Sequence, residues 1–388
     1  MIPYGRQDIC EADIEAVLAV LKSDFLTQGP LVATFEQAVA DYCGVQNAVA
    51  MNSATGALHI ACLALGVKTG DVVWTSPISF VASANCALYC GATIDFVDID
   101  PKTYNMSVRS LENKLSLITD SSQLPKVVIP VHLGGQPCDM AAIHALSKKY
   151  GFYVIEDASH AIGSRYFGKR VGNCCYSDIT VFSFHPVKII TTGEGGMALT
   201  KDPVVANKMK QLRSHGITRD ASEMTHAPDG LWYYQQICLG YNYRMDDVHA
   251  ALGLSQLSRI EKFIEKRQSI ASIYNKLFSN LPIFTPWQHE AGVSSFHLYI
   301  IRLDLDAFKH GEVFERLRAN GVGVNLHYIP IYRHPYYARM GFKPDDFPEA
   351  ERYYREAISL PIFPLLTEEQ QREIASYLAN PLGHQTIF

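Results

Sequence analysis

The amino-acid sequence predicts an α/β protein in which a mainly parallel sheet is covered by helices on both faces. Between residues 48 and 200, short apolar runs of strand length alternate with stretches of helical periodicity, a pattern typical of parallel strands. The chain has 388 residues, more than one hydrophobic core usually accommodates, so we expect a large domain followed by a smaller one. In such sheets ligands bind at the carboxyl ends of the strands.

The spacing of apolar residues predicts each element in turn. Helices are expected near 14–21 and 35–42, before the first strand. Strands are expected over 48–51, 72–75, 93–97, 126–131, 153–155, 179–183 and 197–200, with helices over 55–65, 80–89 and 140–149. A large domain over 1–245 is then followed by a long connecting helix over 246–280 and a small C-terminal α+β domain over 281–388. In the small domain we expect a strand over 297–303, a helix over 311–320, a loop over 327–337 and a last helix after residue 367.

Composition excludes several classes of function. The formal net charge of −5 gives no excess of positive charge with which to bind nucleic acid. The nine cysteines include no CxxC pair and no spacing suited to zinc, which predicts reduced thiols and no metal site. The sequence shows no apolar leader and no run long enough to span a membrane, so a cytoplasmic location is expected. The expected partners are small molecules and further copies of the chain.

The stretch from Phe182 to Gly196 contains a lysine in apolar surroundings. Lys188 lies among Val187, Ile189 and Ile190, and burial disfavours the ammonium form, so this amine is expected to lose its proton readily. A neutral amine can attack a carbonyl. Taken alone, Lys188 could equally lay its aliphatic stem over apolar surface and extend its charged end into water.

Four other stretches fall where a site at the strand ends requires them. Asp157 follows an apolar strand, and its carboxylate could keep a pyridine nitrogen protonated or simply form a turn or cap a helix. Ala54 and Thr55 follow Ser53 at a strand-to-helix junction that suits a phosphate but also reads as a plain cap. Phe80 offers either a stacking ring or core packing. The segment 240–245 precedes the long helical pattern, and its Asn and Arg either fix a turn or reach a ligand.

A lysine, an aspartate, a phosphate-binding turn and an aromatic ring are together what pyridoxal 5′-phosphate requires of a protein. The lysine binds the cofactor covalently, the carboxylate makes the ring an electron sink, and the turn anchors the phosphate. The combination therefore predicts a site for this cofactor.

Six motifs in order resemble the DegT-type sugar-nucleotide aminotransferases, a family with the aspartate aminotransferase fold (fold type I). They are Thr-Gln-Gly-Pro at 27–30, Asn-Ser-Ala-Thr at 52–55, Glu-Asp-Ala-Ser-His at 156–160, Ser-Phe-His-Pro-Val-Lys at 183–188, Gly-Glu-Gly-Gly at 193–196 and Gly-Tyr-Asn-Tyr-Arg-Met at 240–245. The resemblance implies a mainly parallel, mixed seven-stranded sheet and a pyridoxal phosphate-dependent transaminase.

The resemblance also implies roles for individual residues. Lys188 and Asp157 would be the catalytic residues. The cofactor would be held by Lys188, Asp157, His160, Phe80, Ala54, Thr55, Ser183 and Asn242. Asn242 would reach the phosphate of a neighbouring subunit, which implies a homodimer with shared active sites. The substrate would meet Tyr4, Arg6, Thr27, Gln28, Gly29, His327 and Tyr328, each of which could also be a surface or packing residue.

Further sequence segments resemble those of the family members that act in pseudaminic acid biosynthesis. Among them are Thr-Ser-Pro-Ile-Ser-Phe-Val-Ala at 75–82 and His-Tyr-Ile-Pro-Ile-Tyr at 327–332. These members use L-glutamate to aminate C4 of a UDP-linked 4-keto-6-deoxy-N-acetyl hexosamine. Alternatives are amination of a 3-keto or dTDP-linked sugar, a pyridoxamine phosphate-dependent sugar dehydratase, and a non-catalytic sensor of cofactor or sugar nucleotide. Dehydratases of the family generally replace the lysine or add an iron-sulfur cluster; Lys188 is present and the cysteines lack cluster spacing.

Overall fold

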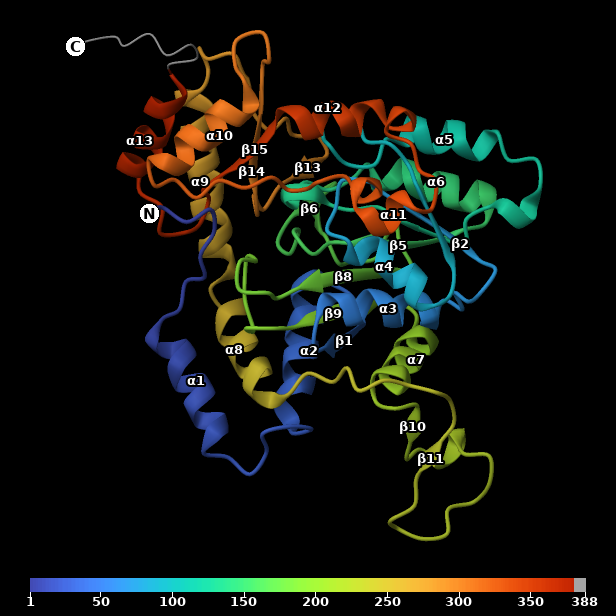
Figure 1. Cartoon of the computed structure of the whole chain (residues 1–388). Coiled ribbons are helices and arrows are strands. Elements are labelled where there is room, and N and C mark those ends of the chain that lie inside the picture. Colours follow the sequence, from blue (N-terminus) through green and yellow to red (C-terminus); the bar gives the residue numbers. More distant parts are fainter. Residues whose placement is uncertain (380–388) are drawn as a thin grey trace.

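The computed structural model describes residues 1–379. A seven-stranded sheet lies at its centre (Figure 1), in the spatial order β1 (Asn47–Met51), β9 (Gly196–Thr200), β8 (Ile179–Ser183), β5 (Tyr153–Asp157), β4 (Val127–Ile129), β2 (Val72–Thr75) and β3 (Thr93–Phe96). Strands β8, β5, β4, β2 and β3 pair in parallel, whereas β9 is antiparallel to both of its neighbours. The predicted fold class, a mixed and mostly parallel seven-stranded sheet, is confirmed.

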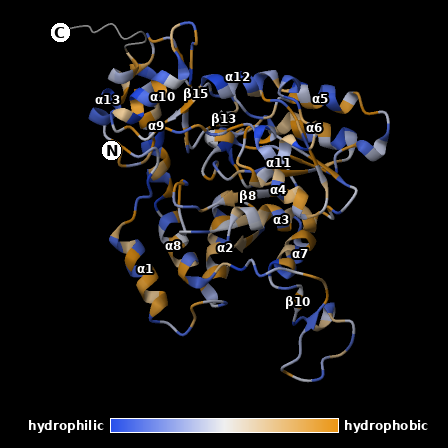
Figure 2. Cartoon of the chain, in the orientation of Figure 1, coloured by the Kyte–Doolittle hydropathy of each residue, from blue (hydrophilic) through white to orange (hydrophobic). Residues whose placement is uncertain are grey.

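Helices cover both faces of this sheet because alternate residues of the buried strands face opposite ways. One face packs against α3 (Ala54–Ala64), α4 (Ala82–Tyr89) and α7 (Pro203–Arg213). The other packs against α2 (Pro30–Cys43) and α8 (Asp247–Leu257), and further along against α5 (Val108–Ser116) and α6 (Met140–Tyr150). Hydrophobic and hydrophilic residues alternate along these helices (Figure 2), and their buried hydrophobic side chains belong to the clusters that pack on the sheet.

The C-terminal part builds a second core. Its sheet has the order β12 (Ile283–Phe284), β14 (Tyr299–Leu303) and β15 (Ala357–Leu360), all antiparallel. It packs with α9 (Ile260–Leu277), α10 (His310–Ala319) and α13 (Glu368–Leu378), while α11 (Pro335–Ala338) and α12 (Pro348–Glu356) return to the large sheet. The division into domains at about residues 245 and 280 stays a prediction, and residues 380–388 of the predicted small domain lie outside the described residues.

The long connecting helix predicted over 246–280 is two helices. Helix α8 ends at Leu257 and α9 begins at Ile260, with Arg259 at a non-helical φ of −108° and ψ of 3°. The Arg259 guanidinium pairs with Asp8 and Asp13 of the N-terminal segment, which favours a break at this point. The apolar spacing continues across the break, so periodicity alone did not reveal it.

Three short elements complete the fold. Helix α1 (Glu11–Leu21) packs on α8, and β10 (Ile217–Thr218) pairs with β11 (Gln235–Gln236) in a hairpin that projects from the body (Figure 1). A small sheet joins β6 (Arg165–Tyr166) to β7 (Lys169–Arg170) and β13 (Gly292–Val293).

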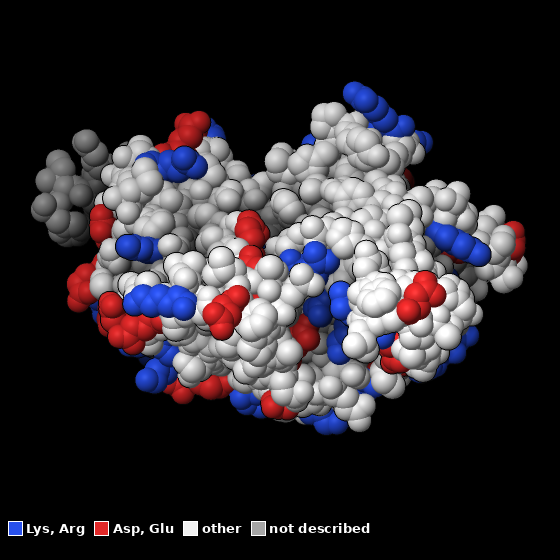
Figure 3. Space-filling model, turned by 90° about the horizontal axis from the view of Figure 1, so that it is seen from below, with Lys and Arg blue, Asp and Glu red and all other residues white. Residues whose placement is uncertain are grey.

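On the face shown in Figure 3, Lys and Arg are interspersed with Asp and Glu. None of the helices within residues 1–379 has the length and apolarity needed to cross a bilayer.

Candidate active site

A cavity of about 540 Å³ lies where the carboxyl ends of β5 and β8 meet the C-terminal part of the chain. Ten of the residues singled out in the sequence line it: Tyr4, Ala54, Thr55, Phe80, Asp157, His160, Ser183, Lys188, His327 and Tyr328. Residues almost the whole length of the chain apart therefore meet at the edge of the sheet where ligands of parallel sheets bind.

Lys188 lies in the turn that follows β8, where its backbone N–H donates to the carbonyl of His185 at 2.9 Å. Burial lowers the pKa of Lys188 to about 8, although the Asp157 carboxylate opposes this by attracting the ammonium. A larger fraction of this amine is therefore neutral near pH 7 than of an ordinary lysine. The prediction of an amine that loses its proton readily agrees with this environment.

Asp157 ends β5 with its carboxylate fixed from two sides. The hydroxyl of Ser83 donates to Oδ2 at 2.6 Å, and the hydroxyl and N–H of Ser159 donate to Oδ1 at 2.6 and 3.1 Å. Because each carboxylate oxygen can accept two hydrogen bonds, Oδ2 can still accept one from a ligand. The side chain is buried but borders the cavity.

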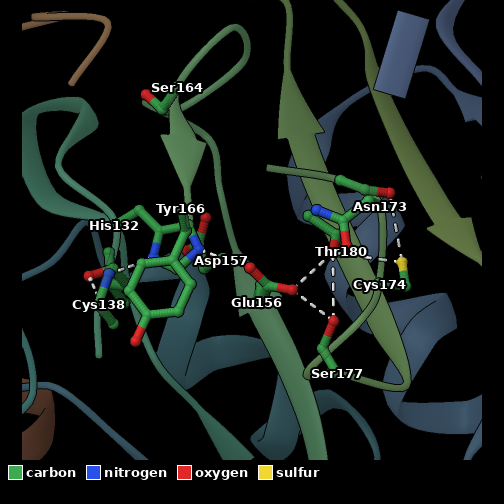
Figure 4. A network of polar contacts seen from close by, with 12 residues as sticks. His132, Cys138, Glu156, Asp157, Ser164, Tyr166, Asn173, Cys174, Ser177 and Thr180 are labelled. Atoms are coloured by element: carbon green, nitrogen blue, oxygen red, sulfur yellow. Dashed lines mark hydrogen bonds and ion pairs between the residues drawn. The ribbon is translucent and has the colours of Figure 1, made fainter. Parts of the chain in front are cut away.

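The preceding residue, Glu156, points to the other face of the sheet, as strand alternation requires (Figure 4). Its carboxylate accepts hydrogen bonds from Ser177, from Thr180 at 3.0 Å and from His132 Nε2 at 2.7 Å. His132 Nδ1 accepts the N–H of Cys138, so the proton that His132 donates to Glu156 is on Nε2. Although burial raises it, these donors hold the pKa of Glu156 below its ordinary value. Glu156 thereby ties β5, which carries Asp157, to β8, which leads to Lys188.

The first turn of α3 borders the cavity and has the geometry that suits an anion. Ser53 caps the helix by accepting the Gly56 N–H at 3.0 Å. Within residues 1–379 the N–H groups of Ala54 and Thr55 have no protein acceptor, so they are free for a ligand. A Cβ on Gly196 would lie 2.4 Å from the Ala54 nitrogen, so only glycine allows β9 to pass this close.

His160 and Tyr328 form another part of the cavity wall. His160 Nδ1 accepts the N–H of Gly134 at 3.2 Å, so its proton lies on Nε2, which donates to the Tyr328 hydroxyl at 3.1 Å. Burial, reinforced by the charge of Lys188, keeps the pKa of His160 well below its ordinary value. Burial also raises the pKa of Tyr328, so its hydroxyl keeps a proton that it can donate to a third group. Phe80, 57% exposed, lies beside Tyr328 with ring centres 6.2 Å apart.

The N-terminal segment reaches the cavity by pairing with the C-terminal part. Ile2 bridges to Val322, and the carbonyl of Tyr4 accepts the N–H of Ile362 at 3.0 Å. The ring of Tyr4 then lies against His327, with centres 5.3 Å apart. Burial, with the nearby Lys188 charge, lowers the pKa of His327 to about 3, so this ring is neutral.

Five predicted site residues do not line the cavity: Arg6, Thr27, Gln28, Gly29 and Asn242. The loop at 27–29 is held against the start of α8, because the Gly29 N–H donates to Asp247 at 2.8 Å. Arg6 is exposed two residues beyond Tyr4, and Asn242 is exposed and bridges to Ser214. Their predicted roles at the substrate and at a neighbouring subunit's site stay predictions.

Some residues of the site were not found from the sequence. His297 lines the cavity with its ring 4.4 Å from that of His160, and its Nδ1 is buried without a hydrogen-bond partner in the described chain. Asn325 also lines the cavity, and Ser83 supports Asp157 from α4. A histidine before an apolar strand and a serine within a helix carry no local signal of function. Only the tertiary arrangement places them at the site.

The chemistry of these side chains fits pyridoxal phosphate. The amine of Lys188 could react with the aldehyde of the cofactor, and the remaining acceptor position on Asp157 could accept a hydrogen bond from its pyridine nitrogen. The free N–H groups at the start of α3 could donate to its phosphate. A fold of this type with such a site is typical of pyridoxal phosphate-dependent enzymes.

Comparison with known proteins agrees with this class. The model of the DegT/DnrJ/EryC1/StrS aminotransferase family matches residues 7–379. The chain is 40% identical over 363 residues to the UDP-4-amino-4,6-dideoxy-N-acetyl-β-L-altrosamine transaminase of Campylobacter jejuni serotype O:23/36, covering 93% of this chain and 92% of that protein.

Two solved structures are also similar. The PseC aminotransferase of Helicobacter pylori, involved in the biosynthesis of pseudoaminic acid, superposes with a TM-score of 0.88 at 32% identity, covering 97% of this chain and 98% of that one. The putative sugar aminotransferase Spr1654 of Streptococcus pneumoniae in its pyridoxal phosphate form gives a TM-score of 0.88 at 30% identity over 98% of both chains. The chain therefore belongs to the DegT/DnrJ/EryC1/StrS aminotransferase family. It is a sugar-nucleotide aminotransferase that uses pyridoxal phosphate.

Proposed function

We propose that this aminotransferase transfers the amino group of L-glutamate to the C4 keto group of a UDP-linked 4-keto-6-deoxy-N-acetyl hexosamine, giving a UDP-4-amino-4,6-dideoxy sugar. The observation that carries the proposal is the cavity, which brings Lys188 and Asp157 together with the uncharged polar side chains of Tyr4, Asn325 and His327. These three side chains offer hydrogen bonds to sugar hydroxyl and acetamido groups. The transaminase from Campylobacter jejuni and PseC from Helicobacter pylori support the choice of sugar.

Lys188 would carry the proton in both half-reactions. Bound pyridoxal phosphate supplies an aldehyde that links to an amine and a ring that withdraws electrons from the adjacent carbon. The Lys188 amine, neutral in an appreciable fraction because burial lowers its pKa to about 8, can take a proton from Cα of glutamate and later return one to C4 of the sugar.

The remaining side chains bind and orient. Asp157 would keep the pyridine nitrogen protonated, and its orientation is fixed by Ser83 and Ser159. The N–H groups of Ala54 and Thr55, with the Ser183 hydroxyl, would hold the phosphate at the positive end of α3. Phe80 would lie against the ring, and His160 near its hydroxyl.

We further propose that Arg6, Thr27, Gln28 and Gly29 bind the substrate and that Asn242 serves the site of a second copy. Two unpaired apolar surfaces support a homodimer. Helix α1 exposes Ile14, Leu18 and Leu21, and the projecting hairpin segment exposes Leu231, Trp232 and Leu239 (Figures 1 and 2). Monomeric proteins rarely leave such patches open to water.

The test is turnover on a panel of keto sugars. The cofactor-loaded enzyme is incubated with L-glutamate and with UDP-linked 4-keto, UDP-linked 3-keto or dTDP-linked 4-keto sugars, and products are identified by mass and NMR. Formation of the 4-amino product from the UDP-linked N-acetyl sugar, at least tenfold faster than from the others, is expected. Preference for a 3-keto or dTDP-linked sugar would contradict the substrate. Release of a dehydrated sugar, or no turnover with any sugar, would contradict the reaction.

A further inference from the structure

One side chain of the cavity wall, the imidazole of His297, has neither a hydrogen-bond partner nor a part in the proposed transamination. His297 lies just before β14 and is 4% exposed, yet its ring borders the cavity. Nδ1 is buried without a partner, and within residues 1–379 Nε2 forms no hydrogen bond either. Buried polar groups in proteins nearly always have partners, so an unpaired one beside a cavity points to a ligand.

The backbone on both sides of His297 is fixed to the segment that carries His160. The Ser295 hydroxyl donates to the His160 carbonyl at 3.1 Å, and the Leu298 N–H donates to the Gly134 carbonyl at 3.2 Å. Gly134 also donates its own N–H to His160 Nδ1. The two imidazoles lie with ring centres 4.4 Å apart and planes tilted by 44°. The loop that positions His160 therefore also positions His297.

The chain reaches this position through strained backbone. Phe296 has a φ of 48°, a left-handed conformation that bulky residues rarely adopt. The Arg267 guanidinium holds the turn by donating to the carbonyls of Phe296 and His297, each at 3.2 Å. Gly135 allows the close approach, because a Cβ there would lie 3.0 Å from the His160 carbonyl oxygen and 3.1 Å from the Phe296 nitrogen. Strain that is held in place by surrounding contacts is typical of ligand-binding sites.

The His297 ring has its proton on the nitrogen that a molecule in the cavity can reach. Burial lowers the pKa of His297 well below its ordinary value, so the ring is neutral and has a single N–H. A buried N–H without an acceptor is rarer in proteins than a buried acceptor without a donor, which assigns the proton to Nε2 and leaves Nδ1 bare. The Nε2–H group is then a donor available to a ligand.

The other buried histidines of the cavity wall use both of their ring nitrogens. His160 accepts at Nδ1 and donates from Nε2 in the two hydrogen bonds given above. In His327, Nδ1 lies 2.8 Å from the Ser359 hydroxyl and Nε2 lies 3.5 Å from the Asn325 amide nitrogen. In the described part of the chain, His297 is thus the buried imidazole of this cavity with an unused N–H.

The charges around the cavity indicate which ligand group needs this donor. Among the lining residues within 1–379, Lys188 is the only lysine or arginine, whereas Asp157 and Glu194 are acidic. L-Glutamate has two carboxylates, and because a carboxylate only accepts hydrogen bonds, N–H or O–H groups must face it. A sugar hydroxyl both donates and accepts, so it depends less on a donor. The free Nε2–H therefore suits the amino donor better than the sugar.

We propose that His297 is a substrate-binding residue for the amino-donor half-reaction, in which its Nε2–H donates to a carboxylate of L-glutamate. The inference rests on the proposed use of L-glutamate. Hydrogen bonds to charged acceptors are the strong ones, so losing this bond should weaken donor binding roughly tenfold or more. The keto sugar would bind through other side chains, so its half-reaction would not depend on His297.

The first experiment measures the two half-reactions separately, from the absorbance of the bound cofactor after rapid mixing. His297→Phe keeps a ring against His160 but lacks the N–H, and His297→Gln restores a donor. With L-glutamate, the half-saturating concentration should rise roughly tenfold or more in His297→Phe and fall back toward the wild-type value in His297→Gln. With the UDP-linked 4-keto sugar and the pyridoxamine phosphate form, both variants should match the wild type. His59→Phe is the matched control, since His59 is buried with an unpaired nitrogen but does not line the cavity.

The second experiment measures binding without turnover. Calorimetry with glutarate, a dicarboxylate that lacks the amino group, should give a Kd roughly tenfold or more above the wild-type value for His297→Phe. Equal values would make His297 a packing residue and overturn the proposal, as would an effect on the sugar half-reaction alone or on both half-reactions equally. A wild type that neither reacts with L-glutamate nor binds glutarate would contradict the proposed donor as well. A wild type that reacts, with variants that match it, contradicts the role of His297 alone.

Discussion

The hydroxyl of Ser83 donates a 2.6 Å hydrogen bond to Oδ2 of Asp157, 74 residues further along the chain. Ser83 in turn lies 2.6 Å from the Ser79 hydroxyl, and neither serine is exposed. The hydrogen bond joins α4 to the end of β5 and sets the direction of the carboxylate that faces the cavity. The ring nitrogen of the cofactor would therefore meet a carboxylate that needs no reorientation.

Ser83→Ala should weaken cofactor binding without unfolding the protein. A hydrogen bond to a charged group contributes about 1.5–3 kcal/mol, which corresponds to a roughly 10- to 100-fold higher Kd for pyridoxal phosphate. Fluorescence titration of the apoenzyme measures this. Ser147→Ala, which removes another buried hydroxyl on α6, is the matched control and should leave the Kd unchanged. An unaltered Kd for Ser83→Ala would show that Asp157 does not depend on this bond.

Tyr328→Phe should lower kcat about tenfold or more while leaving the fold intact. The change removes the hydroxyl that accepts the His160 Nε2–H, so the ring of His160 loses its fixed orientation. Steady-state kinetics with L-glutamate check it. Tyr332→Phe, which loses a 2.9 Å bond to Glu351 away from the cavity, is the control and should retain kcat. Equal kcat in the two variants would contradict a role for Tyr328.

Glu156→Gln should reduce the free energy of unfolding by about 1–3 kcal/mol at neutral pH. The reason is that the side chains of His132, Ser177 and Thr180 lose the charged acceptor of their hydrogen bonds. The pKa of Glu156 is lowered in the folded protein, so its stabilisation is present above its unfolded pKa of about 4.5 and is lost as pH falls through the folded value. The stability difference between wild type and variant should therefore shrink below pH 4.5.

Urea denaturation at pH 7, 5 and 4 measures that difference. Glu112→Gln, on the exposed side of α5, controls for the change of charge and should show no such trend. A difference that stays constant down to pH 4 would mean that the carboxylate is not held in its ionised form.

Mixing inactive subunits tests whether active sites are shared. If Asn242 serves the partner's site, Lys188→Ala and Asn242→Ala chains mixed after reversible dissociation form heterodimers with one intact site. A 1:1 mixture should then recover about a quarter of the wild-type activity, since half of the dimers are mixed and each has one working site of two. If Asn242 acts within its own chain, both sites of every mixed dimer are defective. In that case activity stays at the level of the two variants mixed without exchange.

The sequence predicted the fold because its signals are local. Strand-length apolar runs and helical spacing recur from β1 to β9, and these depend on neighbouring residues alone. The break at Arg259 was missed because its cause, pairing with Asp8 and Asp13, lies about 250 residues away in sequence. Helix α12 was missed because its nine residues are mostly charged and its buried side rests on Ala350 and Tyr353.

The site was predicted unevenly for the same reason. Lys188, Asp157 and Ala54 lie at strand ends or at a helix start, where the adjoining sequence indicates a ligand-binding position. His297 and Ser83 gain their roles only through contacts with His160 and Asp157, and no local pattern reports such contacts. The loop at 27–29 belongs to a specific motif but lies away from the cavity of its own chain, so its placement needs a bound substrate or a second subunit.

The half-reaction with L-glutamate tests the central claim most directly, because it depends on Lys188 and the cofactor but on no sugar. The cofactor-loaded enzyme is mixed with excess L-glutamate, and 2-oxoglutarate is measured together with the visible absorption band of the bound cofactor. The account predicts one 2-oxoglutarate per active site with bleaching of the band, and neither in Lys188→Ala. A wild-type enzyme that keeps its absorption band and releases no 2-oxoglutarate would contradict it.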